Sequence, residues 1–366
     1  MNALTELIRA EIKSGGAMTF AKFMELALYH PQWGYYMSDS VKIGSEGDFY
    51  TAPTATPLFG AMIARQIHQM WQNSGCPEQW SIVECGPGNG QLAWDIMEAL
   101  RREQPDLYKL LDYYLVEISA ELIRTQQNRL AASTAAAKYR WSNSLTELNS
   151  IEGCILANEL VDAFPVHLVQ QRAQGLQELY VTLEEKEAGQ YFRLCPGALS
   201  TNQLAEFFQL QNVCLAENQK AEVNLKARQW LGEGVACLKK GYLLLIDYGA
   251  AKEELYAPKR FNGTLRCFYQ HQLVENPLLN VGKQDITAHV NFSMLALWGE
   301  QLGLKARNLL EQPQFLLNMG VLDFLQKQPD YGQNSQTQQI VSSVKKLLLP
   351  GGMGSIFKVL IFDKLS

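Results

Sequence analysis

The chain has 366 residues, a length that suits one large domain or two ordinary ones. Of its residues 47% are hydrophobic and 19% are charged, and this composition excludes a mainly disordered chain. Its formal net charge of −5 disfavours a nucleic-acid or anionic-membrane binder, because phosphate binding needs a basic face. No run of about 18 apolar residues and no C-x-x-C pair occurs, so neither a transmembrane helix nor a disulfide framework is expected.

The first residues, MNALTELIRAEIKSGG, have the spacing of an amphipathic helix and lack the apolar core of a secretory signal. We therefore expect a cytoplasmic protein, or a mitochondrial matrix protein if a presequence has been removed. Helices are expected over residues 1–30 and 59–72, with a loop rich in Gly, Thr and Pro at 41–58 between them.

Strand-like and helix-like segments alternate from residue 81 onward, which predicts a parallel sheet covered by helices. The expected strands are 81–85, 113–118, 154–157 and 241–248, and the expected helices are 91–103, 119–131 and 223–239. Three strand-like runs within 166–196 predict an antiparallel insertion. Strands at 304–310 and 357–365, with a helix around 314–327 between them, predict an antiparallel edge of the sheet.

These segments suggest four regions along the chain. They are an N-terminal helical or lid region at 1–75, the first part of the α/β core at 76–165, an insertion at 166–235 and the rest of the core at 236–366.

The sharpest local signal is the glycine loop Glu84-Cys85-Gly86-Pro87-Gly88-Asn89-Gly90, which lies between an expected strand and an expected helix. Alternate glycines let the backbone turn sharply and approach a ligand, and the helix N-terminus offers free N–H groups. The spacing differs from the G-x-G-x-x-G of dinucleotide binders. An S-adenosylmethionine site, a nicotinamide site and a structural turn all remain open, and Glu84 could hold an ammonium group or order the loop.

Polar residues also follow the next strands. Glu117, with Ile118 beside it, suits hydrogen bonding to ribose hydroxyls, and Ser142 and Asn143 lie where an adenine would be bound. Asn158, Glu159 and Asp162 follow the third strand and would face the reactive end of a bound cofactor, because ligands sit beyond the carboxyl ends of parallel strands. The alternative is that these acids cap the following turn.

Taken together, these motifs resemble the MidA-like family of S-adenosylmethionine-dependent methyltransferases. That family includes a mitochondrial complex I assembly factor that methylates an arginine of a complex I subunit. The resemblance covers nearly the whole chain, and its most specific parts are GDFYT (47–51), NELVDAFP (158–165) and DITAHVNF (285–292). Two positions depart from the family pattern, because Thr54 and Asn291 stand where acids are common.

The resemblance implies a class I methyltransferase fold, with a mostly parallel seven-stranded sheet and an antiparallel edge strand, and S-adenosyl-L-methionine as the cofactor. It also implies that the N-terminal region and the insertion help to form a substrate cleft. We expect cofactor contacts from Glu84, Gly86, Pro87, Gly88, Asn89, Gly90, Glu117, Ile118, Ser142, Asn143 and Asn158. The five histidines are widely spaced, so no metal site is expected.

The resemblance implies an arginine of a protein substrate, such as a complex I subunit or its bacterial counterpart. This arginine would arrive as a planar cation that two carboxylates can bind. Glu159 and Asp162 are the candidate pair, with Asp48 and Asp285 as weaker candidates. His289 could accept the released proton.

Three further expectations are weaker. His271 is a second candidate proton acceptor, and residues 33–51 could fold over the cofactor as a lid. Exposed strands of the insertion could pair two subunits into a homodimer. The open alternatives for function are a small-molecule methyltransferase, a dehydrogenase, and an assembly or binding factor that keeps the cofactor site without catalysis.

Overall fold

The structure of the chain is a computed structural model. It describes residues 2–38, 56–187, 189–270, 272–326, 342, 344–345, 347–349, 354 and 356–365. Within these ranges no helix is long and apolar enough to cross a membrane.

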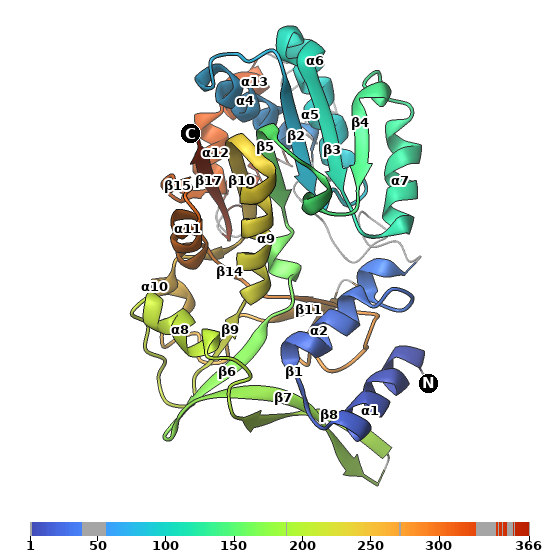
Figure 1. Cartoon of the computed structure of the whole chain (residues 1–366), viewed down its shortest axis with the longest axis vertical. Coiled ribbons are helices and arrows are strands. Elements are labelled where there is room, and N and C mark those ends of the chain that lie inside the picture. Colours follow the sequence, from blue (N-terminus) through green and yellow to red (C-terminus); the bar gives the residue numbers. More distant parts are fainter. Residues whose placement is uncertain are drawn as a thin grey trace.

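A central sheet with the strand order β15-β17-β10-β5-β2-β3-β4 forms the upper part of the molecule (Figure 1). Within this order, the neighbouring strands β10, β5, β2, β3 and β4 are parallel, and β17 pairs antiparallel with β10. This arrangement confirms the predicted sheet and its antiparallel edge. The strands are β2 (Trp80–Cys85), β3 (Leu111–Val116), β4 (Tyr139–Ser142), β5 (Ile151–Asn158), β10 (Leu238–Ala250), β14 (Val290–Asn291), β15 (Lys305–Ala306), β16 (Leu310–Glu311) and β17 (Phe357–Lys364).

Helices cover both faces of this sheet because its inner strands are apolar on both sides. In β5, Leu156 packs against the side of α4 and α5, whereas Ile155 packs against the side of α9 and α11. The helices of this part are α4 (Pro57–Asn73), α5 (Gln91–Glu103), α6 (Pro105–Leu110), α7 (Ala120–Leu130), α9 (Leu225–Cys237), α10 (Lys252–Leu255), α11 (Phe292–Gln301), α12 (Gln312–Asn318) and α13 (Val321–Gln326), with short 3₁₀ turns η2 (Ala136–Lys138), η3 (Leu145–Glu147) and η4 (Val161–Ala163).

A second lobe combines the N-terminus with the insertion. Its sheet has the order β1-β7-β6-β9, with β8 on β7, and a smaller sheet has the order β12-β11-β13. The elements are α1 (Ala3–Gly15), β1 (Met18–Thr19), α2 (Phe20–Tyr29), η1 (Tyr35–Met37), β6 (His167–Arg172), β7 (Gly175–Lys186), β8 (Gly189–Gly197), α8 (Gln203–Leu210), β9 (Lys220–Val223), β11 (Arg266–Tyr269), β12 (Gln272–Val274) and β13 (Asp285–Thr287).

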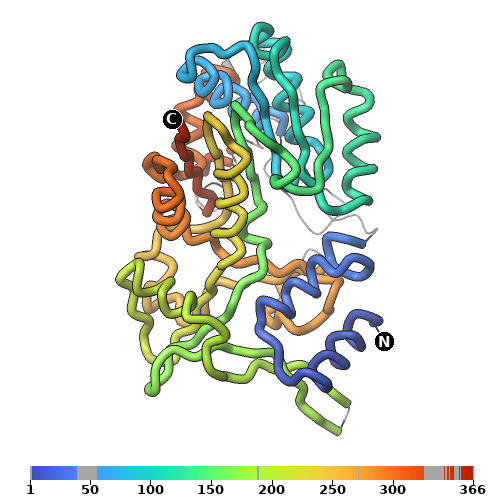
Figure 2. Tube along the Cα trace, viewed as in Figure 1, coloured from blue at the N-terminus to red at the C-terminus, as the bar shows by residue number. Residues whose placement is uncertain are grey.

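The antiparallel insertion was predicted, but its pairing with the N-terminus was not. Met18 lies opposite Val181 in the sheet, so the blue N-terminal trace runs beside the insertion in Figure 2. A hydrophobic core joins the two, and Phe23 of α2 and Leu179 of β7 are among its buried members. The N-terminal helices are therefore an integral part of this lobe.

Four predicted boundaries were wrong. The helix expected over residues 1–30 is divided into α1 and α2 by the short strand β1. The helix expected at 223–239 begins only at Leu225, because Asn224 caps it and Val223 belongs to β9. The helix expected around 314–327 is split into α12 and α13, and Gly320 has a φ of 76° at the break, a conformation that ends helices. The strand expected at 304–310 is reduced to the two-residue strands β15 and β16.

A hydrogen-bonded pair of side chains inside the second lobe gives a first testable prediction. His167 Nδ1 lies 2.7 Å from Glu178 Oε1, and Ser200 N donates to Glu178 Oε2 at 2.7 Å. Burial alone would raise the pKa of Glu178, but these hydrogen bonds outweigh burial and lower it. The pair therefore stabilises the fold above the unfolded pKa of about 4.3, and this contribution disappears as the pH falls through the folded value.

Replacing Glu178 with glutamine is expected to cost about 1–3 kcal/mol at pH 7, because a buried charge-assisted hydrogen bond is weakened. The difference in thermal midpoint between the wild type and Glu178→Gln should shrink below pH 4, as the wild-type carboxylate takes up its proton. Thermal unfolding from pH 3 to pH 8 measures it. Parallel curves for the two proteins would show that Glu178 does not contribute as a charged group.

Candidate functional site

Five parallel strands end at one edge of the central sheet, and this edge faces the second lobe, with α2 across from it (Figure 1). In parallel α/β sheets ligands bind at this carboxyl edge. The glycine loop, Glu117, Ser142, Asn158 and Asp247 all lie at the carboxyl ends of these strands. The sheet therefore brings together the residues that the sequence had placed after successive strands.

The glycine loop turns tightly from β2 into α5. Gly86, Gly88 and Gly90 have φ values of 66°, 54° and 79°, a left-handed conformation that glycine adopts at little cost. A Cβ at Gly86 would lie 2.8 Å from Leu160 Cδ1, so a side chain there would have to displace the end of Leu160. Gly90 N donates to Pro87 O at 2.9 Å, and Asn89 Oδ1 accepts from Gln91 N at 3.1 Å at the start of α5.

Glu84, at the base of the loop, is only 3% exposed. The hydroxyl of Tyr113 donates to its Oε2 at 2.7 Å. Burial raises the pKa of Glu84 to about 7, and the hydrogen bond from Tyr113 acts in the opposite direction. Of the two roles considered for Glu84, the contact with Tyr113 corresponds to ordering the strand end beneath the loop.

Glu117 lies at the end of β3 with its carboxylate held in place. Its Oε1 accepts from Ile118 N and from Ser119 N, both at 2.9 Å. The side chain of Ile118, next to this carboxylate, is 53% exposed. A fixed carboxylate beside an open apolar surface fits a ribose attached to a flat, apolar-faced base, so these residues suit a nucleoside cofactor.

The segment after β4 lies beside Glu117, whose N–H donates to Ser142 O at 3.0 Å. Glu147 holds this segment, with its Oε2 2.6 Å from Ser142 Oγ and 2.9 Å from the donating Asn143 N. Asn143 is exposed. The predicted adenine-binding residues therefore adjoin the predicted ribose-binding residue.

Gln126 of α7 was missed by the sequence reasoning. Its side chain is buried between the glycine loop, Glu117 and Trp141 and forms hydrogen bonds to all three. No motif contains it, because a glutamine inside an amphipathic helix carries no signal of its own until the packing is known.

Glu159 has an unusual backbone conformation, with a φ of 54° in a residue other than glycine. Such a conformation costs on the order of 1–3 kcal/mol and is concentrated at functional sites. Two neighbours fix the carboxylate, since Asn158 Nδ2 donates to Oε1 and Tyr248 Oη donates to Oε2, both at 3.2 Å. The side chain is thus oriented before any substrate arrives.

Asp162 and Asp247 lie next to Glu159 and are buried. Asp247 Oδ2 accepts from the backbone N–H groups of Leu160, Val161 and Asp162, at 3.2, 2.8 and 3.3 Å, and so ties η4 to the end of β10. Burial raises the pKa of Asp162 well above its usual range, and the charges of Asp247, Asp285 and Glu159 raise it further.

Two tyrosines of the second lobe contact the acidic cluster or the turn that carries it; Tyr36 lies within the lid expected at 33–51, and Tyr29 was not identified by the sequence reasoning. Tyr36 Oη donates to Asp285 Oδ1 at 2.6 Å, and Tyr29 Oη donates to Ala163 O at 3.0 Å. Their rings stack with centroids 5.5 Å apart. Burial raises the pKa of Tyr29, and the charges of Asp285, Asp162 and Glu117 raise it further. We refer to Glu159, Asp162, Asp247 and Asp285 as the acidic cluster.

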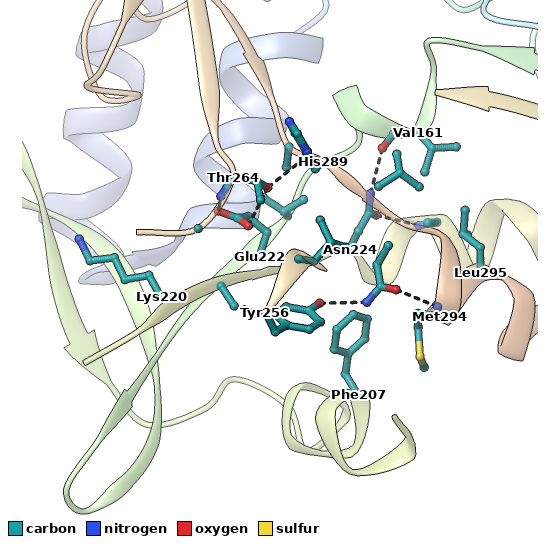
Figure 3. A pocket seen from close by; sticks show the side chains of 18 of the residues that line it. Val161, Phe207, Lys220, Glu222, Asn224, Tyr256, Thr264, His289, Met294 and Leu295 are labelled. Atoms are coloured by element: carbon teal, nitrogen blue, oxygen red, sulfur yellow. Dashed lines mark hydrogen bonds between the residues drawn. The ribbon is translucent and has the colours of Figure 1, made fainter. Parts of the chain in front are cut away.

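His289 adjoins the acidic cluster along the chain, because the N–H of its neighbour Ala288 donates to Asp162 O at 2.9 Å. It lines a cavity of about 30 Å³ together with Glu222, Thr264 and Val161, as Figure 3 shows. The backbone N–H of His289 donates to Thr264 Oγ1 at 3.0 Å. Burial lowers its pKa to about 4, so the imidazole is neutral at pH 7. Neither Asp162 nor Glu159 lines this cavity.

The remaining candidates cannot be placed. Asp48, His271 and residues 39–51 of the expected lid lie outside the described residues. Among the described residues no group of three or more His, Cys, Asp or Glu side chains is arranged to hold a metal ion.

Comparisons with known proteins give a consistent result. Residues 62–310 match the model of a family described as "putative S-adenosyl-L-methionine-dependent methyltransferase". The chain is 28% identical to the Drosophila melanogaster protein named "Protein arginine methyltransferase NDUFAF7 homolog, mitochondrial", over 98% of this chain and 84% of that protein. It is also 28% identical to the human protein arginine methyltransferase NDUFAF7, over 97% of this chain and 83% of that protein.

Two solved structures from Burkholderia thailandensis resemble the whole chain. One, a candidate methyl transferase bound to S-adenosyl-homocysteine, is 34% identical with a TM-score of 0.90 and covers 99% of this chain and 92% of that one. The other, a native crystal structure, is 33% identical with a TM-score of 0.86 and covers 99% of this chain and 91% of that one.

Proposed function

The chain belongs to this family of S-adenosyl-L-methionine-dependent methyltransferases, and from that premise we propose that it methylates an arginine side chain of a protein. Its cofactor is S-adenosyl-L-methionine, and its fold is that of the class I methyltransferases. The dehydrogenase alternative for the glycine loop is therefore set aside.

We propose that the carboxyl edge of the sheet holds the cofactor. Glu117 would bind the ribose hydroxyls, Ile118 and Asn143 would lie against the adenine, and the glycine loop would lie along the methionine part. The exposed face of Ile118 next to the fixed Glu117 carboxylate supports this assignment. When bound, the cofactor supplies a methyl group activated by a positive sulfonium.

The acidic cluster is the observation on which the proposal of an arginine substrate rests. Asp162, Asp247 and Asp285 are buried, and Glu159 is half-buried beside them. Burial raises the pKa of Asp162, and repulsion from Asp247, Asp285 and Glu159 raises it further. A guanidinium group is planar, permanently charged and rich in N–H donors, so it would relieve this repulsion and form bidentate hydrogen bonds. Glu159, fixed by Asn158 and Tyr248, would orient it, and Asp162 would bind its other edge.

The names of the curated relatives agree with this proposal, since they are called protein arginine methyltransferases. The resemblance suggests a respiratory complex I subunit, or its bacterial counterpart, as the protein substrate. A second candidate function is methylation of a small cationic molecule. The deep burial of the cluster favours it, since Asp162 is 4% exposed and Asp285 is 1% exposed.

An assay of methyl transfer separates these functions. The purified enzyme should transfer tritium from methyl-labelled S-adenosylmethionine to protein in an extract of cells that lack its gene. Acid hydrolysis of that protein should then yield labelled methylarginine. The matched control is the Gly88→Val variant in the same extract. Label found only in the small-molecule fraction would favour the second function, and labelled lysine would contradict both the guanidinium argument and the proposal.

A further inference from the structure

The side chain of Gln126 occupies a position where a polar group is costly. Of the residues of α7, Gln126 and Leu130 are buried, and Gln126 is 0% exposed. An amide removed from water costs on the order of 1–3 kcal/mol unless it finds hydrogen-bond partners inside the protein. A leucine there would cover the same surface without that cost, so the polar group calls for an explanation.

The amide of Gln126 uses both its oxygen and its nitrogen. Trp141 Nε1 donates to Gln126 Oε1 at 3.0 Å. Gln126 Nε2 donates to Gly88 O at 2.9 Å and to Glu117 Oε2 at 3.3 Å. The indole can only donate, whereas the carbonyl and the carboxylate can only accept, so the orientation of the amide is determined by its partners.

These three partners come from three segments of the proposed cofactor site. Gly88 lies in the glycine loop after β2, Glu117 ends β3, and Trp141 lies in β4 just before Ser142. One amide thus connects the parts expected to bind the methionine, the ribose and the adenine. The next turn of α7 adds a second link, because Arg129 donates to Gln91 at the start of α5.

The hydrogen bond to Glu117 completes the fixation of that carboxylate. Its Oε1 is held by two backbone N–H groups and its Oε2 by Gln126, so rotation about the last side-chain bond would break at least one contact. A group held in its binding geometry loses less entropy when the ligand arrives. We propose that Gln126 is a positioning residue that sets the affinity for the cofactor by holding Glu117 and the Gly88 carbonyl in place. This inference rests on the cofactor site proposed above and not on the identity of the substrate.

The test is calorimetric titration of the full chain with S-adenosyl-homocysteine. Gln126→Met keeps the length of the side chain and removes its hydrogen bonds, and we expect at least tenfold weaker binding. The KM for S-adenosylmethionine should rise by a similar factor, while kcat at saturating cofactor changes little. A general loss of packing would not produce this separation of KM from kcat.

Gln219→Met is the matched control. Gln219 is 1% exposed and its amide also forms three hydrogen bonds, to Ala216 N, Tyr256 O and Ala257 O, away from the carboxyl edge. We expect this variant to lose thermal stability and to bind S-adenosyl-homocysteine as the wild type does. Equal losses of affinity in both variants would overturn the inference, since they would indicate a general effect of removing a buried amide.

A double-mutant cycle tests whether Gln126 acts through Glu117. Glu117→Gln should weaken binding strongly by itself, and adding Gln126→Met should then weaken it by less than threefold. Full additivity of the two effects would overturn the inference. If Gln126→Met does not fold, Trp141→Phe takes its place, because it removes the donor to Gln126 Oε1 and keeps an aromatic ring, although a smaller one, at this position. A severalfold loss of affinity is expected from it.

The controls separate this inference from the site on which it rests. A wild-type chain that fails to bind S-adenosyl-homocysteine, or a Glu117→Gln variant that binds it normally, contradicts the proposed cofactor site. Normal binding by Gln126→Met or by its Trp141→Phe substitute, together with weak binding by Glu117→Gln, overturns only the role of Gln126.

Discussion

Replacing Gly88 with valine should abolish measurable binding of S-adenosyl-homocysteine, with a loss of at least about 100-fold in affinity. Gly88 has a φ of 54°, a left-handed conformation that a β-branched residue rarely adopts. Its carbonyl also accepts the hydrogen bond from Gln126, so a shift of the loop would disturb the contacts around Glu117. Each factor of ten in affinity corresponds to about 1.4 kcal/mol, so a distortion of about 3 kcal/mol is sufficient.

Gly175→Val provides the control for backbone strain. Gly175 has a φ of 115° in the insertion, and a Cβ there would have no neighbour within 4 Å. In Gly175→Val the positive φ should lower the stability of the fold by a comparable amount. The variant should still bind S-adenosyl-homocysteine. Calorimetric titration and thermal unfolding of both variants make the comparison. Normal binding of S-adenosyl-homocysteine by Gly88→Val would contradict the assignment of the glycine loop to the cofactor site.

Replacing Glu159 with glutamine should lower the rate of methyl transfer by about 100-fold or more, while the affinity for S-adenosyl-homocysteine stays within a few-fold of the wild type. Glutamine keeps the size of the side chain and an oxygen that can accept from Tyr248, but it loses the charge that would bind a guanidinium. Removing a charge-assisted hydrogen bond from a reaction site costs on the order of 2.7–4 kcal/mol in related cases. Single-turnover rates with the identified protein substrate measure the effect.

The Glu178→Gln variant is the matched control for this change, because it makes the same substitution at a buried, hydrogen-bonded carboxyl group. It lies in the second lobe, where Glu178 pairs with His167, and it should lower stability without changing the rate per folded molecule. Equal activity of Glu159→Gln and the wild type would contradict the proposed role of Glu159 in the reaction. Loss of cofactor binding in Glu159→Gln would assign the residue to the cofactor instead.

The central sheet was predictable because its strands are short apolar runs that end at glycine or at acids. Ser81–Cys85 ends at the glycine loop, and the run at 241–248 ends at Asp247 and Tyr248. Parallel topology then brings these ends to one edge without further information. This is why residues as distant in sequence as Gly86 and Glu159 could be assigned to one site before the structure was known.

Residues that reach the site across the lobe interface were not predictable. Tyr29 and Tyr36 belong to an aromatic N-terminal segment, and only the packing of α2 against the insertion brings them to Asp285 and Ala163. The role suggested for His289 stays a prediction, and its side chain lines a cavity that Glu159 and Asp162 do not line. Periodicity and spacing report on local structure, whereas these contacts depend on how two lobes meet.

The pairing of β1 with β7 has a consequence for synthesis on the ribosome. The core of the second lobe draws on residues 4–35, 166–194 and 265–288, whereas the strands β2 to β5 form one continuous stretch of the chain at 80–158. The N-terminal helices α1 and α2 emerge first and contact each other, but the strands of the insertion that complete their core follow only after more than 130 further residues. Closing such a long loop is slow, and exposed apolar surface invites aggregation in the meantime. The nascent chain would thus fold its middle before its beginning, and its first helices are natural clients for chaperones that bind near the exit tunnel.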